Sequence, residues 1–166
     1  MPVNGFDTTI SWSDFQPLSA RPQGVDEDAQ IHPEMRPGNI KLGRKGNAVI
    51  ITDITIDIAL VGADCWVVSG QSSNDLLKHE QGHYDILALS AREFHSKLLK
   101  LSAKSTQDLQ QQVNDLKSKM EKTVQKVDKR YDTQTNHSRD TQNQQLWNKK
   151  ISEEKQKPDG SIDNLP

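Results

Sequence analysis

The chain has one cysteine, Cys65, among its 166 residues. It can therefore form neither an internal disulfide nor a cysteine-rich zinc site. Beside Trp66 and Val67, Cys65 is expected to be a small buried apolar residue. A cysteine–histidine nucleophile pair is the alternative interpretation of this residue.

The chain also lacks a long hydrophobic run and a strong net charge. Hydrophobic residues make up 33% of it, and no run approaches the ~18 residues of a membrane span. The start, MPVNGFDTTI, has neither the basic nor the apolar segment of a secretory signal, so we expect a soluble and, by sequence, cytoplasmic protein. A net charge of -2 predicts no general attraction to nucleic acid. The lysine-rich stretch between residues 97 and 130 is expected to be a solvated helix face.

Alternating apolar and polar residues predict strands in the first third of the chain. Residues 8–15 are expected to form a short strand and the proline-rich residues 16–38 a loop. Residues 39–43 and 47–61 are predicted to pair across a turn at 44–47. In the second of these strands Ile54, Ile56, Ile58 and Leu60 share one face. Residues 64–68 extend this strand or begin another.

Helical periodicity dominates the rest of the chain. The capping residues 72–75 start a helix that is expected to run from Asp75 to Leu101. A second helix begins near Ser105 or Thr106 and has a narrow apolar seam made of Leu109, Val113, Leu116, Met120, Val124 and Val127. Residues 131–140 are expected to be irregular and 142–151 to form a short third helix. Residues 152–166 are predicted to be a disordered tail.

The first helix carries His79-Glu80-Gln81-Gly82-His83, an HExxH motif. Residues i and i+4 lie about 40° apart around a helix and about 6 Å apart along it, so both imidazoles can reach one ion. Glu80 can then approach a water molecule on the metal as a general base. The competing interpretation is a pair of core histidines satisfied by hydrogen bonds.

A catalytic zinc ion requires a third protein ligand and an open position. Glu93 and His95 lie too far along the same helix, and Asp85 points away from the histidine pair. His32 is a weak candidate in the proline-rich segment. His137, in an irregular segment, is favoured as the third ligand, with Glu121 on the second helix as the alternative.

Two blocks of the chain resemble a bacterial family of domains of unknown function that are described as predicted secreted zinc-dependent proteases. Residues 76–86, followed by Ala91-Arg92, resemble the family's LLxHEQxHFDI block and its Ala-Arg pair. Residues 131–138 and 144–151 resemble its YDxxTxHG and QxxWxxxI blocks. Ser138 departs from this pattern, since the family usually has glycine there. The chain also lacks the export signal that "secreted" implies.

The resemblance implies that His79 and His83 are ligands, that Glu80 is catalytic and that His137 is the third ligand. In that arrangement Tyr131 is expected to point its hydroxyl at the open face of the metal and to help stabilise the oxyanion. Asp132 or Thr135 is expected to hold the loop or the free N–H of a ligand imidazole.

These patterns predict one zincin-like α+β domain over residues 1–151. A small N-terminal mixed or antiparallel sheet packs on the HExxH helix, and a long second helix and a short third helix follow. The predicted function is a metallopeptidase that holds one Zn²⁺ per chain and acts on a peptide or protein substrate. The alternatives are a catalytically inactive zinc-binding module used for recognition and an interaction protein that binds through its long basic helix.

Overall fold

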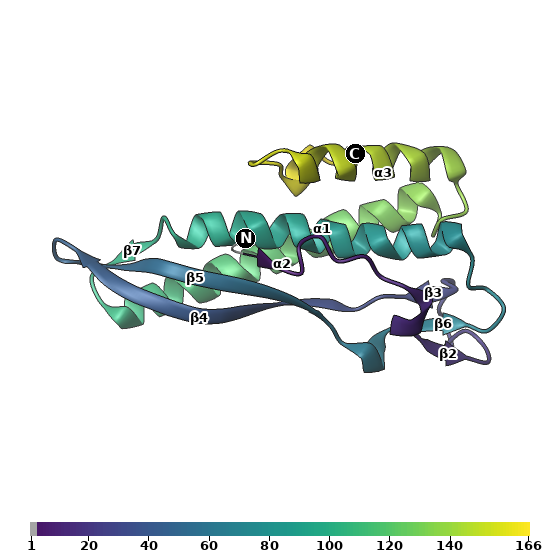
Figure 1. Cartoon of the computed structure of the whole chain (residues 1–166), viewed down its shortest axis with the longest axis horizontal. Coiled ribbons are helices and arrows are strands. Elements are labelled where there is room, and N and C mark those ends of the chain that lie inside the picture. The colour runs from purple at the N-terminus through teal and green to yellow at the C-terminus, as the bar shows by residue number, and fades with distance from the viewer. Residues whose placement is uncertain (1–2) are drawn as a thin grey trace.

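The computed structural model describes residues 3–166 and has the predicted α+β architecture. Figure 1 shows an elongated molecule in which a long β-hairpin lies along one side of α1 (Asn74–Leu98). The helix α2 (Thr106–Thr135) packs against α1, and α3 (Thr141–Gln156) packs on both of these helices. The HExxH motif therefore lies in the central helix of the fold.

The strands form two small sheets. In the first, β5 (Ala48–Leu60) pairs with β1 (Val3–Asn4) in parallel and with β4 (Pro33–Lys45) and β7 (Ser102–Ala103) in antiparallel orientation. In the second, β6 (Trp66–Val68) lies between β2 (Gln16–Leu18) and β3 (Ala29–Gln30). Three short 3-10 helices complete the fold of residues 3–166: η1 (Trp12–Asp14), η2 (Gly62–Asp64) and η3 (Ile162–Asn164).

The predicted hairpin is confirmed, and its first strand is longer than expected. Ile54 and Ile56 face the core as the alternation predicted. Ile51 is also buried, although regular alternation from Ile54 would place it on the opposite face. The register explains this, because Asp53 pairs with Lys41 while Ile51 pairs with the next residue, Leu42, which leaves Thr52 as an extra residue. Such a bulge turns the strand so that both of its halves bury isoleucines on the core side.

The strand predicted at residues 8–15 is wrong. This segment contains η1, and its backbone bonds locally and to side chains rather than to a neighbouring strand. The Ile10 N–H donates to Gln81 Oε1 at 2.9 Å, and the Ser11 N–H donates to Asp14 Oδ2 at 2.7 Å. The buried Ile10 thus anchors an irregular segment against α1.

The loop predicted at residues 16–38 is wrong in part, because β2, β3 and the start of β4 fall within it. Its prolines suggested a loop, since proline cannot donate a ladder hydrogen bond. Pro33 and Pro37, however, lie in β4, and Pro17 lies in β2. Both are edge strands of their sheets, where proline is tolerated.

The helix starts are confirmed. The Ser73 and Ser105 hydroxyls cap α1 and α2 by accepting from Leu76 N and Asp108 N. The irregular segment expected from residue 131 instead begins after Thr135, because Tyr131 and Thr135 extend the apolar seam of α2 and are fully buried.

The C-terminal residues differ from the expected disordered tail. The helix α3 continues to Gln156, and Ile162 and Leu165 belong to the core. Arg92 fixes this segment, because its guanidinium donates to the carbonyls of Glu154 and Gly160 at 2.8 and 3.0 Å. The Ala-Arg pair after the HExxH motif thus has a structural role.

Glu154 is the acidic anchor of the same segment, and it predicts acid sensitivity. Its Oε2 accepts from Ser161 N and Asn164 Nδ2 at 3.0 and 2.9 Å, and its Oε1 contacts Lys157. The hydrogen bonds from Asn164 and Lys157 lower the pKa of Glu154 to about 2. A carboxyl group whose pKa is lowered in the folded state stabilises the fold at pH values above its ordinary pKa. This stabilisation is lost as the pH falls.

We therefore expect Glu154→Gln to lower the melting temperature at pH 6, with a difference from wild type that shrinks as the pH falls from about 5 to about 2. Thermal unfolding followed by circular dichroism over this range is the measurement. Glu121→Gln is the control, because Glu121 forms only an exposed ion pair with Lys117. A difference in melting temperature that does not change with pH would contradict the conclusion that the ionised Glu154 carboxylate stabilises the fold.

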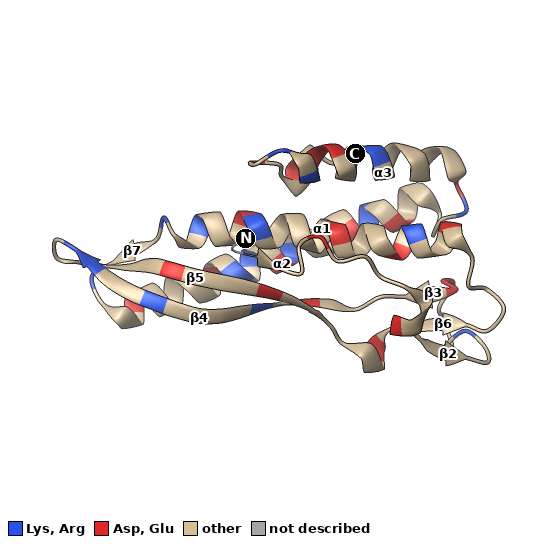
Figure 2. Cartoon of the chain, in the orientation of Figure 1, with Lys and Arg blue, Asp and Glu red and all other residues tan. Residues whose placement is uncertain are grey.

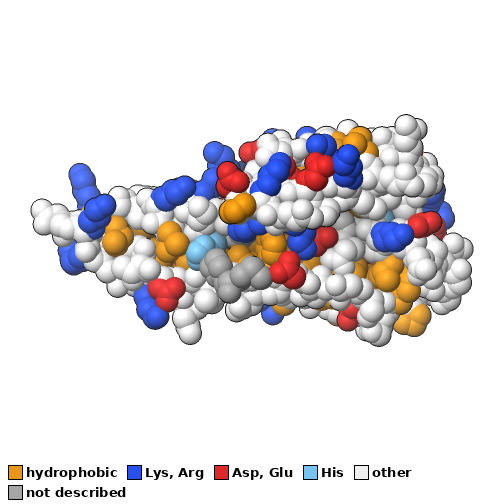
Figure 3. All heavy atoms as spheres, turned by 45° about the horizontal axis from the view of Figure 1, so that its top comes forward, with side chains coloured by type: hydrophobic (Ala, Val, Ile, Leu, Met, Phe, Trp, Pro, Cys, Tyr) orange, Lys and Arg blue, Asp and Glu red, His pale blue; other side chains and the backbone are white. Residues whose placement is uncertain are grey.

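Charged residues of both signs are distributed along the helices and the hairpin (Figure 2). On the face shown in Figure 3, basic and acidic groups are interspersed and hydrophobic side chains form small separate groups. None of the helices in residues 3–166 combines the length and the apolar character needed to cross a membrane.

Candidate metal centre

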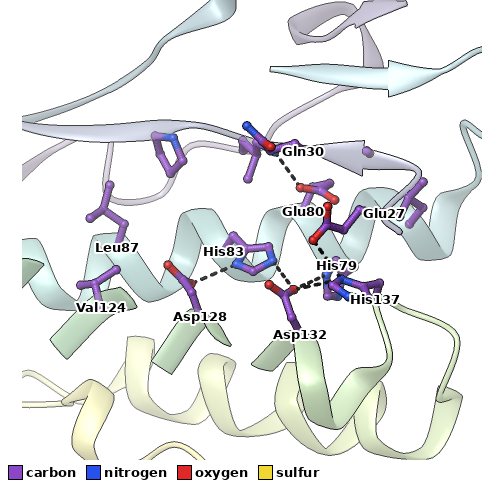
Figure 4. Close-up of a pocket in the computed structure, with 14 residues that line it drawn as sticks. Glu27, Gln30, His79, Glu80, His83, Leu87, Val124, Asp128, Asp132 and His137 are labelled. Carbon is purple, nitrogen blue, oxygen red and sulfur yellow. Dashed lines mark hydrogen bonds and ion pairs between the residues drawn. The ribbon is translucent and has the colours of Figure 1, made fainter. Parts of the chain in front are cut away.

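The HExxH residues face a pocket of about 270 Å³ between α1, α2 and the segment that leads from β3 into β4. Figure 4 shows His79, Glu80 and His83 pointing into this pocket from α1, with Asp128 and Asp132 rising from α2 and His137 entering from the loop after α2. The predicted constellation is therefore brought together from three segments of the chain.

His79 is buried, and both of its ring nitrogens are engaged. Its Nδ1 lies 3.0 Å from Gln144 Oε1, and its Nε2 lies 3.1 Å from Asp132 Oδ1. The ring of Tyr131 stacks against it with centroids 4.6 Å apart. Burial lowers the pKa of His79, which favours the neutral imidazole that binds a metal.

His83 has a parallel arrangement one helical turn later. Its Nδ1 lies 3.0 Å from Asp128 Oδ1, and its Nε2 lies 2.9 Å from Asp132 Oδ1. Burial opposes the charged ring, but the hydrogen bonds to Asp128 and Asp132 outweigh it and raise the pKa of His83 well above its usual value. An acceptor on Nδ1 is the arrangement that orients metal-ligating histidines.

The two Nε2 atoms converge on one point, which Asp132 Oδ1 occupies. Burial alone would raise the pKa of Asp132, but its hydrogen bonds to His79 and His83 lower it, so the carboxylate is ionised. Two imidazole nitrogens and a carboxylate oxygen that face one another are typical zinc donors.

His137 brings a third imidazole to this point. Its Nδ1 is buried and makes no hydrogen bond with the described residues; it lies 3.6 Å from Asp132 Oδ1 and 3.8 Å from Glu27 Oε1. The potential ligand atoms of His79, Asp132 and His137 lie within 4.8 Å of one another. A buried nitrogen without a partner is costly, and a metal ion would satisfy it. His79, Asp132 and His137 therefore fit a bound zinc ion; His83 is not part of this group, although its Nε2 contacts Asp132.

The backbone that presents His137 is strained. Asn136, His137 and Ser138 have φ values of 47, 51 and 73°, in the left-handed region that favours glycine. Such strain is characteristic of functional sites where the surrounding structure fixes it. Serine at position 138, where the resembled family usually has glycine, adopts the conformation for which glycine is suited.

Glu80 lies beside the histidines without bonding to either of them. Its side chain is buried, and Oε2 accepts a hydrogen bond from Ile31 N at 2.9 Å. Burial raises the pKa of Glu80 to about 7, and Asp132 reinforces the effect. A carboxylate with a pKa near neutrality suits a general base.

Gly82 allows the two helices that build the site to approach closely. A Cβ at this position would lie 2.2 Å from the Tyr131 hydroxyl oxygen and 2.6 Å from its Cζ. The hydroxyl instead donates to the His79 carbonyl at 3.1 Å. The glycine inside the HExxH motif thus sets the contact between α1 and α2.

Tyr131 differs from its expected position. Its hydroxyl accepts from Gln144 Nε2 at 2.6 Å and lies against the backbone of α1, and the residue does not line the pocket. Its ring supports His79 from behind. Burial raises the pKa of Tyr131, so its hydroxyl keeps its proton. In this structure the tyrosine orients a histidine and does not face the open side of the site.

The other candidates lie outside this pocket. Glu121 pairs with Lys117, and His32 is exposed near Glu34 and Asp64. Asp85 points away from the histidines, as expected, and pairs with Lys155 at 2.8 Å. Cys65 is buried, as expected, and its Sγ accepts from His32 N.

Sequence reasoning missed Asp128, the acceptor for His83. A signal for it exists, because Asp128 and Asp132 are four residues apart and so share a helix face with the same spacing as the histidines. Asp132 was expected to hold the loop or an imidazole N–H, and it contacts both ring systems of the motif. Thr135 Oγ1 lies 3.4 Å from His79 Nδ1.

The fold and the site define an α+β protein with a histidine–carboxylate cluster built on an HExxH helix. Residues 62–138 match the model of a family described as bacterial protein of unknown function (DUF922). The match contains α1, α2 and His137 but spans under half of the chain. No curated protein and no solved structure matches the chain.

Proposed function

We propose that this chain is a zinc-dependent peptidase with a zincin-like site. The observation that carries the proposal is the convergence of the His79 and His83 Nε2 atoms on one point, with the unpartnered His137 Nδ1 beside it and Glu80 adjacent. His79, His83 and His137 would hold the zinc ion. When bound, zinc supplies a Lewis acid that makes water acidic enough to attack a peptide carbonyl near neutral pH.

The chain's own groups would perform the proton transfers. Ile31 N holds Glu80 Oε2, which leaves Oε1 to take a proton from the attacking water. The same carboxyl group would then deliver this proton to the departing amine. Gln144 and Asp128 would keep the two motif imidazoles oriented through their Nδ1 atoms.

A second candidate is an inactive zinc-binding module, and the position of Asp132 favours it. Its Oδ1 lies between the two motif imidazoles, where a fourth protein ligand would close the coordination shell. Structural zinc sites have four protein ligands, whereas catalytic sites keep one position open. A measurement of peptide hydrolysis distinguishes the peptidase from the inactive zinc-binding module.

Metal removal tests the proposal. Protein loaded with one equivalent of zinc is expected to cleave a denatured protein substrate, and protein dialysed against a chelator is expected to lose this activity and regain it with added zinc. New amino termini measured with an amine-reactive dye give the rate. Stoichiometric zinc without cleavage would favour the inactive module, and the absence of zinc binding would refute both functions.

A further inference from the structure

A second cavity, of about 610 Å³, continues from the metal centre. Residues Ile31–Pro37 form one wall, and residues of α2 between Lys117 and Asp128 form the other. This groove and the metal-site pocket share the lining residues Ile31, Pro33, Leu87, Val124 and Asp128. The two cavities therefore form one continuous cleft.

The wall formed by β4 is the free edge of its sheet. Among the described residues, β4 pairs with β5 on one side and with no strand on the other. A free edge presents backbone N–H and C=O groups that an extended chain can pair with. In this protein that edge borders the cleft.

The register shows which backbone groups point outward. The Val61 N–H donates to the His32 carbonyl at 2.9 Å, so the backbone groups of His32 point toward β5. Residues of an antiparallel strand alternate between positions whose backbone groups bond to the partner strand and positions whose groups do not. The backbone groups of Pro33, Met35 and Pro37 therefore point away from β5. Proline has no N–H, and the Ile31 N–H is taken by Glu80. Met35 is therefore the one outward donor of residues 31–37.

The spacing connects this donor to the metal centre. A strand rises about 3.3 Å per residue, so Met35 lies about 13 Å along the chain from Ile31, which contacts Glu80. The charges in the groove are paired, because Arg36 contacts Glu34, Lys117 contacts Glu121 and Asp128 contacts His83. Backbone groups rather than net charge would therefore select the ligand.

We propose that the groove binds an extended peptide that pairs with the Met35 N–H and C=O groups and leads into the metal centre. The proposal rests on the proposed peptidase function, for which it defines the substrate as an unfolded segment and not a folded surface. The two prolines limit the pairing to one donor, which hinders the growth of a longer sheet with another copy.

The test uses zinc-loaded Glu80→Gln protein, which binds without cleaving, and a pool of randomised decapeptides blocked at both ends. Met35→Pro in this background should weaken binding about three- to tenfold relative to Met35→Ala, because one hydrogen bond is lost. Both substitutions remove the methionine side chain, so their difference reports the N–H. Proline should be tolerated there, as it is at the outward positions 33 and 37.

Hydrogen exchange of the Met35 amide, measured by NMR with and without the pool, gives a second readout that needs no substitution at Met35. Slower exchange in the presence of peptide is expected. Equal affinities of the proline and alanine variants with unchanged exchange would overturn the groove proposal even if wild type cleaves peptides. Protection of Met35 in a protein that cleaves nothing would support the groove and refute the peptidase function.

Discussion

Glu80→Gln is expected to abolish hydrolysis while the zinc content stays at the wild-type value. The carboxylate lines the same pocket as the two motif histidines and bonds to neither of them. General-base catalysis contributes about 10²- to 10⁴-fold to a rate. Glutamine cannot accept a proton at this position, so the rate constant should fall by about that factor.

The substitution should leave the fold intact. Glutamine has the same shape as glutamate, and its carbonyl oxygen can still accept the hydrogen bond from Ile31 N. Zinc content by elemental analysis and the melting temperature establish that the site and the fold persist. Loss of zinc in this variant would mean that Glu80 is a ligand.

Glu153→Gln is the matched control, because it makes the same chemical change on the surface of α3, where Glu153 pairs with Lys150. This control is expected to retain the wild-type rate. Unchanged hydrolysis in Glu80→Gln would exclude this residue as the base and would move attention to the other carboxylates of the pocket, Glu27, Asp128 and Asp132.

The helical part of the fold could be predicted because its signals are local. Ser73 and Ser105 mark the starts of α1 and α2, and the seam from Leu109 to Val127 lies on the buried face of α2. The first third of the chain could not be predicted as well, because its strands depend on distant partners. Nothing local to Gln16 or Ala29 shows that both strands pair with β6.

The C-terminal segment illustrates the same limit. Residues 152–166 are polar, and their order depends on contacts with Arg92 and on a few apolar side chains such as Ile162. Composition alone therefore suggested disorder. In the site, residue type and spacing predicted the two motif histidines and Glu80. The partners of the histidine Nδ1 atoms could not be predicted in this way, because they depend on how three helices pack together.

The zinc ligand set is the second expected result of large effect. His79→Ala and His83→Ala should each lower the zinc affinity more than about 100-fold, since changes to outer partners of a metal site already cost about 10- to 100-fold. His137→Ala is expected to show a loss of the same size, because its Nδ1 is buried beside the converging imidazoles without a hydrogen bond. Asp132→Asn should cause a smaller loss, because Asp132 is not one of the three proposed ligands. Competition with a chromophoric chelator measures all four affinities.

The comparison of His137→Ala with Asp132→Asn decides whether His137 or Asp132 is the third ligand. The geometry permits either, because both residues lie close to His79. His32→Ala is the matched control, since His32 is exposed and lines the groove rather than the metal-site pocket; it should keep the wild-type affinity. His79 is buried against Tyr131, so its substitution also lowers stability, whereas the partly exposed ring of His83 and the loop position of His137 allow folded variants. If His137→Ala keeps the wild-type affinity and Asp132→Asn loses it, the third ligand is the α2 carboxylate, and His137 instead lines the cleft as a group that contacts substrate.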